Sequence, residues 1–546
     1  MSDPWPTRGR LIVNDLLRGA GAKASGRVAA TVGSLMLVAG GAQAQLVDKT
    51  KAPNTAGEGI AKSLADQVGA GRGDWLTPDS SSFIVARDPF RAIRRGRQLF
   101  QRKFTQAEGQ GPGVGDGTGD IHANLAIGAG LADSCAACHG RPRGSAGFGG
   151  DVVTRPDSRD APHLFGLGLK EMLADEITAE LRAIRTQAVA DAQRSGRDRT
   201  RRLVGKGIRY GTLTAHSDGS VDATRVSGVD PDLRVRPLFA HGGTTSIREF
   251  VVGALQNEMG LQAVDPELAA AAAGGRITTP AGMVLDGSLD RIETAPTADA
   301  TADPDADGVT HEVPESLVDY SEFYLLNYFK PAIYLRRDDT QRGGRLLTRI
   351  GCTECHVRDL RIDHDRRVAD VETVYDGTRG ILNTLFATAT PLVSSRDDGS
   401  GFPPVKAPLR QPFVVRDIFT DFKRHDLGPA FHERNYDGSV QEQFLTTPLW
   451  GVGSTAPYGH DGRSINLTEV ILRHGGEARV ARDAFASLPP GNRAALLDFL
   501  SSLVLFPPDD TASNLDPGDR NAPGFPQAGH GSIKLGVLFN DPSDKE

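Results

Sequence analysis

One five-residue pattern occurs twice and constrains this chain more than any other feature. CAACH at 135–139 and CTECH at 352–356 contain all four cysteines of the 546-residue sequence. C-x-x-C-H is the attachment signature of a c-type haem, in which both thiols bond to one porphyrin and the next imidazole ligates the iron. The sequence therefore predicts two covalent haem c groups. The expected attachment residues are Cys135, Cys138, Cys352 and Cys355, and the expected iron ligands are His139 and His356.

Other uses of paired cysteines are possible. A single C-x-x-C pair can be a thioredoxin-like redox centre or half of a zinc site, and an exported protein can form disulfides. A zinc site of four cysteines would leave the histidine after each pair unexplained, and two small C-x-x-C loops would be an unusual disulfide framework. Two complete copies with no spare cysteine favour haem.

The first residues have the pattern of an export signal. Basic residues up to Arg27 precede an apolar stretch, 28–42, which ends in the small-x-small sequence Ala42-Gln43-Ala44. This predicts a signal peptide at 1–44, cleaved before Gln45. The alternative is a single anchoring helix, but the stretch is short and rich in Gly and Ala. No later segment is apolar enough to cross a bilayer, so we expect a periplasmic or secreted bacterial protein with no membrane span after cleavage.

Composition excludes some partners. The net charge is only -7, and no Lys/Arg run with interleaved aromatics suggests nucleic-acid binding. Gly (64) and Pro (33) are abundant and aromatics make up 6%, which favours loops and short helices.

The expected fold is mainly α-helical, with two cytochrome-c-like haem domains, long loops and an insertion in the first domain. Helical periodicity is visible at 88–104 (with Ile93, Leu99 and Phe100 inward), 171–193, 246–256, 340–350 and 492–506, whereas 269–307 has the composition of loops. The expected division is a surface segment at 45–85, a first domain at 86–320 with its insertion near 194–232, a second domain at 321–510 and a tail at 511–546.

A haem's role depends on its sixth ligand, because an open iron can bind peroxide or dioxygen whereas a closed one transfers electrons. Between Gly140 and Pro162 there is no His, Met or Cys, so the first haem is expected to be open. The nearest candidates are His163 and Met172. For His163 the plainer interpretation is a polar residue beside a helix start.

Six short segments carry a family resemblance: LFGLGL (164–169), NEMG (257–260), HDLG (425–428), TPLWGVG (447–453), HDGR (460–463) and HGGEA (474–478). They resemble the bacterial di-haem oxidoreductases, which are related to di-haem cytochrome c peroxidases and to the di-haem enzyme that matures methylamine dehydrogenase. The resemblance extends from about Arg91 to Phe506.

The resemblance implies roles for three residues. His474 stands where related peroxidases place the distal ligand of the second haem, usually Met, which implies bis-His ligation with His356 and a low potential. His460 matches a histidine that lies beside this haem and not on its iron. Glu258 matches a glutamate that acts as acid and base in O–O cleavage at the open haem. The alternative for Glu258 is a helix-end carboxylate that caps neighbouring amides.

Two departures from the peroxidases leave the substrate open. Phe250 replaces their distal Gln, and Ala240, followed by His241, replaces their inter-haem Trp. The related rubber-cleaving haem oxygenases also have an apolar distal pocket. The preferred function is a peroxidase-type oxidoreductase that takes electrons from a small cytochrome or cupredoxin. The alternatives are an oxygenase or oxidase of an organic small molecule and a non-enzymatic electron-transfer cytochrome.

Asp303, Asp305 and Asp307 alternate before Gly308, a pattern that resembles a calcium loop. No Glu stands at the twelfth position, although Glu312 and Glu315 are close. Related peroxidases bind calcium between their domains, whereas the alternative is an acidic, solvated loop.

Overall fold

The computed structural model describes residues 64–104, 134–140, 160–293, 299, 301, 310–328, 333–334, 340–375, 385–435 and 438–505. All of them belong to one compact unit, Val47–Glu546. The expected signal peptide, the aspartates 303, 305 and 307, and the tail 511–546 lie outside the described residues. Within the described ranges no helix has the length and apolar character to cross a membrane.

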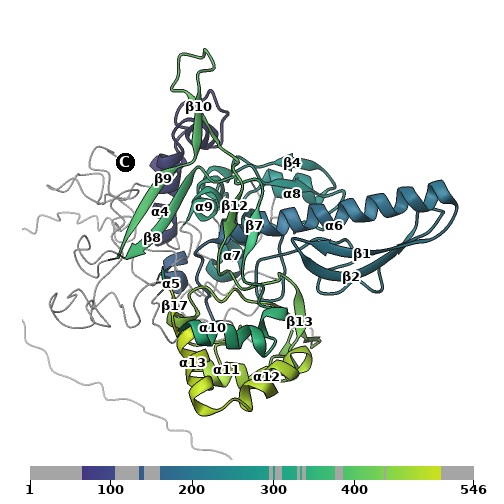
Figure 1. Ribbon diagram of the computed structural model, residues 1–546. Helices are drawn as coiled ribbons and strands as arrows, with labels where there is room; N and C mark the ends of the chain where they lie inside the picture. The colour runs from purple at the N-terminus through teal and green to yellow at the C-terminus, as the bar shows by residue number, and fades with distance from the viewer. Residues whose placement is uncertain are drawn as a thin grey trace, which may run out of the picture. The chain divides into compact units, whose positions relative to one another are not determined.

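Helices and short strands alternate along the chain (Figure 1). The α-helices are α2 Leu64–Val68, α3 Ser81–Arg87, α4 Pro89–Gln101, α5 Cys135–His139, α6 Leu167–Ser195, α7 Ile247–Met259, α8 Pro266–Ala272, α9 Glu315–Asn327, α10 Thr340–Arg349, α11 Leu467–Arg473, α12 Arg479–Ala486 and α13 Pro490–Ser501. Three short 3-10 helices are η2 Cys352–Glu354, η3 Val452–Ser454 and η4 Gly476–Ala478.

The strands pair only in small antiparallel sheets. They are β1 Arg199–Gly205, β2 Ile208–Ala215, β3 Val221–Asp222, β4 Arg276–Thr278, β5 Val284–Asp286, β6 Ile333–Tyr334, β7 Leu360–Ile362, β8 Ala369–Tyr375, β9 Leu385–Pro391, β10 Val393–Arg396, β11 Val405–Pro408, β12 Phe413–Val415, β13 Arg424–Asp426, β14 Glu433–Arg434, β15 Val440–Gln441, β16 Gln443–Leu445 and β17 Leu503–Val504. Of the residues described, 40% are helical and 18% are in strands, so the expectation of a mainly α fold of two cytochrome-c-like domains was wrong.

The clearest source of this error is the insertion expected at 194–232, which forms the sheet β1-β2-β3. β1 and β2 are joined by Lys206 and Gly207, which both have positive φ (50° and 82°), as a two-residue hairpin turn requires. Buried positions alternate along β2, and the sheet lies along α6 (Figure 1). The signal was a Lys-Gly pair between the segments RTRRLVG and IRYGTLTA, in which Thr, Val, Ile, Leu and Tyr alternate in part with Arg.

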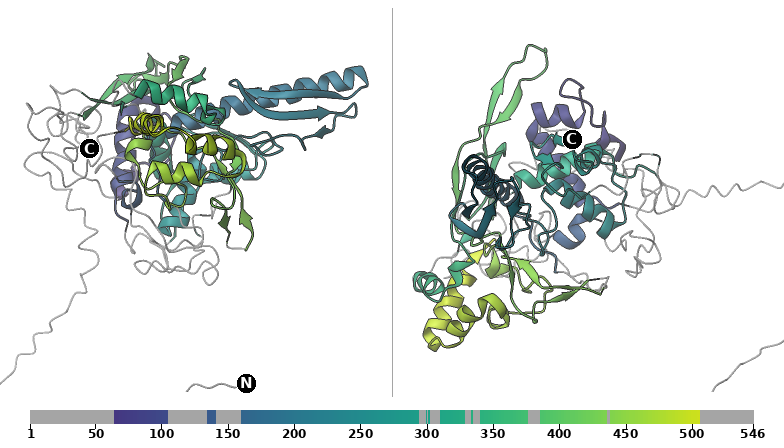
Figure 2. Two further views of the ribbon diagram at one scale, coloured as in Figure 1. Left: turned by 60° about the horizontal axis from the view of Figure 1, so that its bottom comes forward. Right: turned by 90° about the vertical axis from the view of Figure 1, so that its right-hand side faces the viewer.

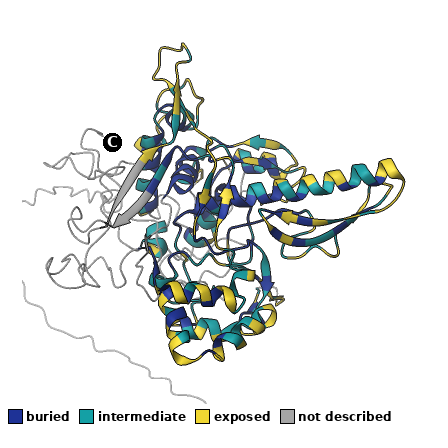
Figure 3. Ribbon diagram, in the orientation of Figure 1, coloured by how far each residue is buried: buried dark blue, intermediate teal, exposed yellow. Residues whose placement is uncertain are grey.

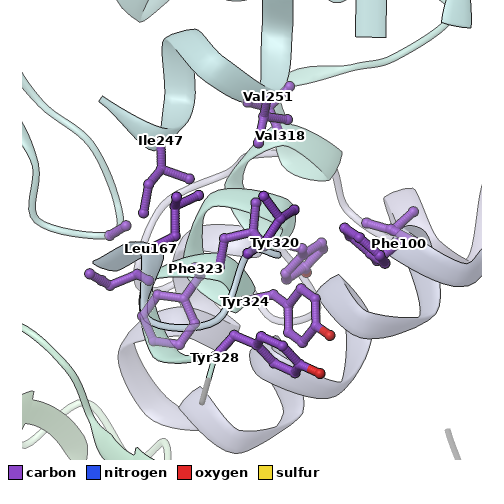
Figure 4. Close-up of a cluster of buried hydrophobic side chains, with 14 of the residues drawn as sticks. Phe100, Leu167, Ile247, Val251, Val318, Tyr320, Phe323, Tyr324 and Tyr328 are labelled. Atoms are coloured by element: carbon purple, nitrogen blue, oxygen red, sulfur yellow. The ribbon is translucent and has the colours of Figure 1, made fainter. Parts of the chain in front are cut away.

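In the first half of the chain, α4 crosses α9. Asp88 caps α4 by accepting from the Arg91 N–H, and the expected inward residues Ile93, Leu99 and Phe100 are all buried. A Cβ at Gly96 would lie 2.2 Å from the Tyr320 carbonyl oxygen, so only glycine permits this close crossing. Figure 4 shows the resulting core, with Tyr320 and Tyr324 on α9 and Tyr328 directly after it. The domain boundary expected after residue 320 falls inside this helix.

The second half repeats the arrangement. α10 precedes the second C-x-x-C-H motif as α4 precedes the first, and it packs on α13 (Figure 2). A Cβ at Gly343 would lie 2.0 Å from the Ala495 carbonyl oxygen and 2.6 Å from the Phe499 Cβ. The helices expected at 340–350 and 492–506 are therefore confirmed, with α13 beginning two residues earlier and ending at Ser501.

A buried ion network fixes α7 against α9. Arg248 is fully buried and binds Asp265 (2.7 Å), Asp319 (2.8 Å) and Glu322 (3.0 Å). A capping box of Ser246 and Glu249 begins α7. Figure 3 shows α9 buried over nearly its whole length, whereas exposed residues gather on β1, β2 and the far end of α6. The network matters because α7 carries Phe250 and Glu258.

Candidate haem sites

The first C-x-x-C-H motif forms the short helix α5, and its histidine is held by the backbone. His139 Nδ1 lies 2.8 Å from the Pro162 carbonyl oxygen. A carbonyl can only accept, so Nδ1 carries the proton and Nε2 keeps its lone pair. Burial lowers the pKa of His139, although Pro162 and the charge of Glu258 act in the opposite direction. A neutral imidazole oriented through Nδ1 is the form that ligates iron.

The second motif shows the same geometry. His356 follows η2, and its Nδ1 lies 2.9 Å from the Phe419 carbonyl oxygen. Burial lowers the pKa of His356 to about 4, and the charge of His474 contributes in the same direction. His356 is therefore neutral, with Nε2 available to a metal.

His474 ends α11 and also binds a carbonyl, that of Val470, through Nδ1 at 2.6 Å. Its charge lowers the pKa of His356, so the two imidazoles lie within electrostatic range of each other, although they come from opposite ends of the second half. The ring edge of Phe431 packs on His474 with centroids 5.2 Å apart, and the Arg473 guanidinium lies over Phe431 at 4.2 Å. Neighbouring rings and a cation thus hold His474 in place.

His460 lies beside this site with a different set of contacts. Its Nε2 is 3.0 Å from Glu433 Oε2, and its ring stacks on Phe444 with centroids 3.9 Å apart. Phe431 contacts both His460 and His474. Because a carboxylate occupies Nε2, His460 supports the site instead of offering a free donor to it.

Glu258 and Phe250 both lie on α7. Glu258 lies near the end of the helix, before the left-handed Gly260, and its charge acts on His139. Phe250 packs on Phe239 with ring centroids 5.1 Å apart. Phe250 and Cys135 are both partly buried against the same large hydrophobic core. Glu258 thus lies within electrostatic range of the first motif's histidine. The structure places Ala240 in a backbone contact, where its carbonyl accepts from the Leu445 N–H.

His163 takes part in a contact between the two halves. Its Nε2 lies 3.2 Å from the carbonyl oxygen of Trp450, a residue that sequence reasoning did not single out as functional. Burial, together with the charge of Lys170, lowers the pKa of His163 to about 3. Nδ1 is buried and no described group binds it. Nε2, the ring nitrogen that most often ligates iron, is therefore already hydrogen-bonded to the Trp450 carbonyl oxygen.

A charged cluster borders the second motif. Ligand atoms of Cys355, Asp421 and His425 lie within 4.8 Å of one another. His425 Nε2 is 3.0 Å from Asp421, and its Nδ1 is 2.8 Å from Glu477. Burial opposes a charge on His425, but Asp421 and then Cys355 outweigh it and raise its pKa to about 10. The HDLG and HGGEA segments thus meet through His425 and Glu477, a contact that only the fold reveals.

The donor sets fit haem c. None of the four cysteines, all in described segments, forms a disulfide. Each motif presents a neutral histidine whose Nδ1 is fixed and whose Nε2 is free.

Residues 359–503 match the family described as "Di-haem oxidoreductase, putative peroxidase". This segment is similar to the di-haem oxidoreductases. It begins just after the second motif and contains His425, His460 and His474, so the expected family resemblance is confirmed over these residues.

No curated protein matches this chain. Among solved structures, a chain of Kuenenia stuttgartiensis hydrazine synthase pressurized with 20 bar xenon is 13% identical. The match covers 58% of this chain and 88% of that chain, with a TM-score of 0.21. So low a TM-score carries no argument about the fold.

Proposed function

We propose that the chain is a di-haem c oxidoreductase of the peroxidase type, with a reactive first site and an electron-transferring second site. The observation that carries the proposal is the difference between the two sites. His474 offers a free Nε2 at the second site, whereas His163 near the first commits its Nε2 to Trp450. The charged side chain that acts on His139 is the carboxylate of Glu258.

The residues for each haem follow from these contacts. Cys135 and Cys138 would hold the first haem covalently, and Cys352 and Cys355 the second. His139 would ligate the first iron through Nε2, and His356 and His474 would ligate the second from its two faces. When bound, haem supplies an iron that exchanges single electrons and, where its sixth position is open, binds an oxygen ligand.

Glu258 is proposed as the acid and base of the reaction. A carboxylate on the open face can take the proton from one peroxide oxygen and return it to the other, which leaves as water. Complete reduction of peroxide to two waters consumes two electrons and two protons. We propose that the electrons come from a small cytochrome or cupredoxin and enter at the second site.

A second candidate is an oxygenase or oxidase of an organic molecule. It is favoured by Phe250, which the resemblance places where the peroxidases have their distal Gln and which packs on Phe239, because an apolar wall suits an organic substrate better than peroxide alone. The expected export to the periplasm and the calcium loop remain proposals, and their residues lie outside the described part of the chain.

Spectroscopy of the purified holoprotein tests the proposal. Two haems per chain are expected, one low-spin and one high-spin ferric, and hydrogen peroxide should change only the high-spin signal. Two double variants assign the signals. Cys135→Ala with Cys138→Ala should remove the high-spin haem. Cys352→Ala with Cys355→Ala should remove the low-spin haem. Two low-spin haems that ignore peroxide would overturn the peroxidase function. Dioxygen consumption with an organic substrate would favour the second candidate.

A further inference from the structure

A continuous path of hydrogen bonds and peptide links joins the two C-x-x-C-H histidines. It starts at His139, whose Nδ1–H donates to the Pro162 carbonyl over 2.8 Å. The next residue along the chain is His163, whose Nε2–H donates to the Trp450 carbonyl over 3.2 Å. His163 thus links the first motif to the TPLWGVG segment of the second half.

The second half completes the path. Trp450 follows Leu449, whose N–H donates to the Ile418 carbonyl over 3.1 Å. Ile418 precedes Phe419, whose carbonyl accepts from His356 Nδ1 over 2.9 Å. Four hydrogen bonds and three short covalent stretches therefore connect one proximal imidazole to the other.

His163 is the one side chain in the middle of this path. Trp450 is 2% exposed and packs in a core shared by α6 of the first half and β7 and β12 of the second. The hydrogen bond from His163 is therefore part-buried, and hydrogen bonds away from bulk water polarise one another more strongly than exposed ones. Groups that bind a ligating imidazole through Nδ1 tune the metal that it holds.

We propose that His163 is a positioning residue that couples the two haem sites electronically along this path. The inference rests on the two haems of the proposed function, but not on the reaction with peroxide. One electron leaves the second site, which is oxidised, and reaches the first site, which is reduced. No proton or covalent bond changes along the way. The path would replace the aromatic relay that is lost where Ala240 stands.

The test measures electron transfer between the haems without peroxide. In the holoprotein, flash photoreduction by a soluble ruthenium dye delivers one electron, and the absorbance of each haem follows its passage. His163→Leu removes the N–H donor and should slow inter-haem transfer by about 10- to 100-fold. His163→Gln, which keeps an N–H donor, should restore most of the rate. His216→Leu, at an exposed histidine paired with Asp198, is the matched control and should leave the rate unchanged.

Each other outcome has a meaning. An unchanged rate in His163→Leu with both haem spectra intact would overturn the coupling role. A low-spin first haem that becomes high-spin in this variant would show that His163 ligates iron, which also overturns it. If the leucine variant does not load haem, His163→Phe gives a ring of similar size with no donor. Fewer than two haems in the unsubstituted protein would refute the proposed function instead.

Discussion

The Nδ1–H of His474 donates to the carbonyl oxygen of Val470, 2.6 Å away in the preceding turn of α11. His139 and His356 make the equivalent bond to Pro162 and Phe419. Three imidazoles on three separate elements are thus fixed through Nδ1, each with Nε2 free. The same local geometry at three positions is what a pair of haem sites with three histidine ligands requires.

Replacing His474 with Met should raise the reduction potential of the second haem. Thioether ligation stabilises ferrous iron relative to imidazole, and axial ligands tune haem potentials over about 0.8 V, so a rise on the order of 0.1 V is expected. A spectroelectrochemical titration measures it. The control is His432→Gln, at a nearby histidine that binds Asp426. If the potential of the second haem stays constant, His474 is not its ligand.

Replacing Glu258 with Gln should slow the reaction of the first haem with peroxide by about 100-fold or more, because the amide cannot move the proton. Stopped-flow absorbance after mixing with hydrogen peroxide gives the rate, and haem content and spectra should not change. Asp218→Asn, at an exposed turn carboxylate, controls for the loss of one charge. If Glu258→Gln reacts at the normal rate, Glu258 is not the acid and base of the reaction and only caps amides at the end of its helix.

The ion pair of His425 and Asp421 should make stability depend on pH. Asp421 holds the pKa of His425 above its usual value of 6.5 in the folded chain, so its stabilisation is complete below pH 6.5 and is lost as the pH rises through the raised pKa. Asp421→Asn should therefore lower the free energy of unfolding by about 2 kcal/mol at pH 6 and by much less above pH 10. Denaturant titrations at pH 6, 8 and 10.5 compare the two proteins. A stability difference that is constant over this range would contradict the prediction.

Gly343 should be irreplaceable at the crossing of α10 and α13. Alanine would place its Cβ 2.0 Å from the Ala495 carbonyl oxygen, and the forced separation of the helices should cost about 1–3 kcal/mol or more. Gly491→Ala, on α13 itself, is the matched control, because no atom lies within 4 Å of its added Cβ. The control should be neutral or up to about 1 kcal/mol more stable. Thermal unfolding followed at the second haem compares them, and equal stability of the two variants would refute the close crossing.

Local patterns in the sequence predicted the helices well. α4, α7, α10 and α13 begin within two residues of the expected positions, because helical periodicity and capping residues such as Asp88 act within a few residues of chain. The strands were missed because most have only two to four residues, and such segments are extended only when a distant partner supplies hydrogen bonds.

The sequence by itself predicted where each haem would be attached, because C-x-x-C-H is a local chemical requirement within five residues. It also determined, through resemblance, that His474, His460 and Glu258 were candidates. Only the tertiary structure decided which carbonyl fixes each imidazole and that His163 reaches Trp450. These contacts join residues far apart in the chain, and their geometry depends on how α6, the second motif and the TPLWGVG segment pack around one shared core.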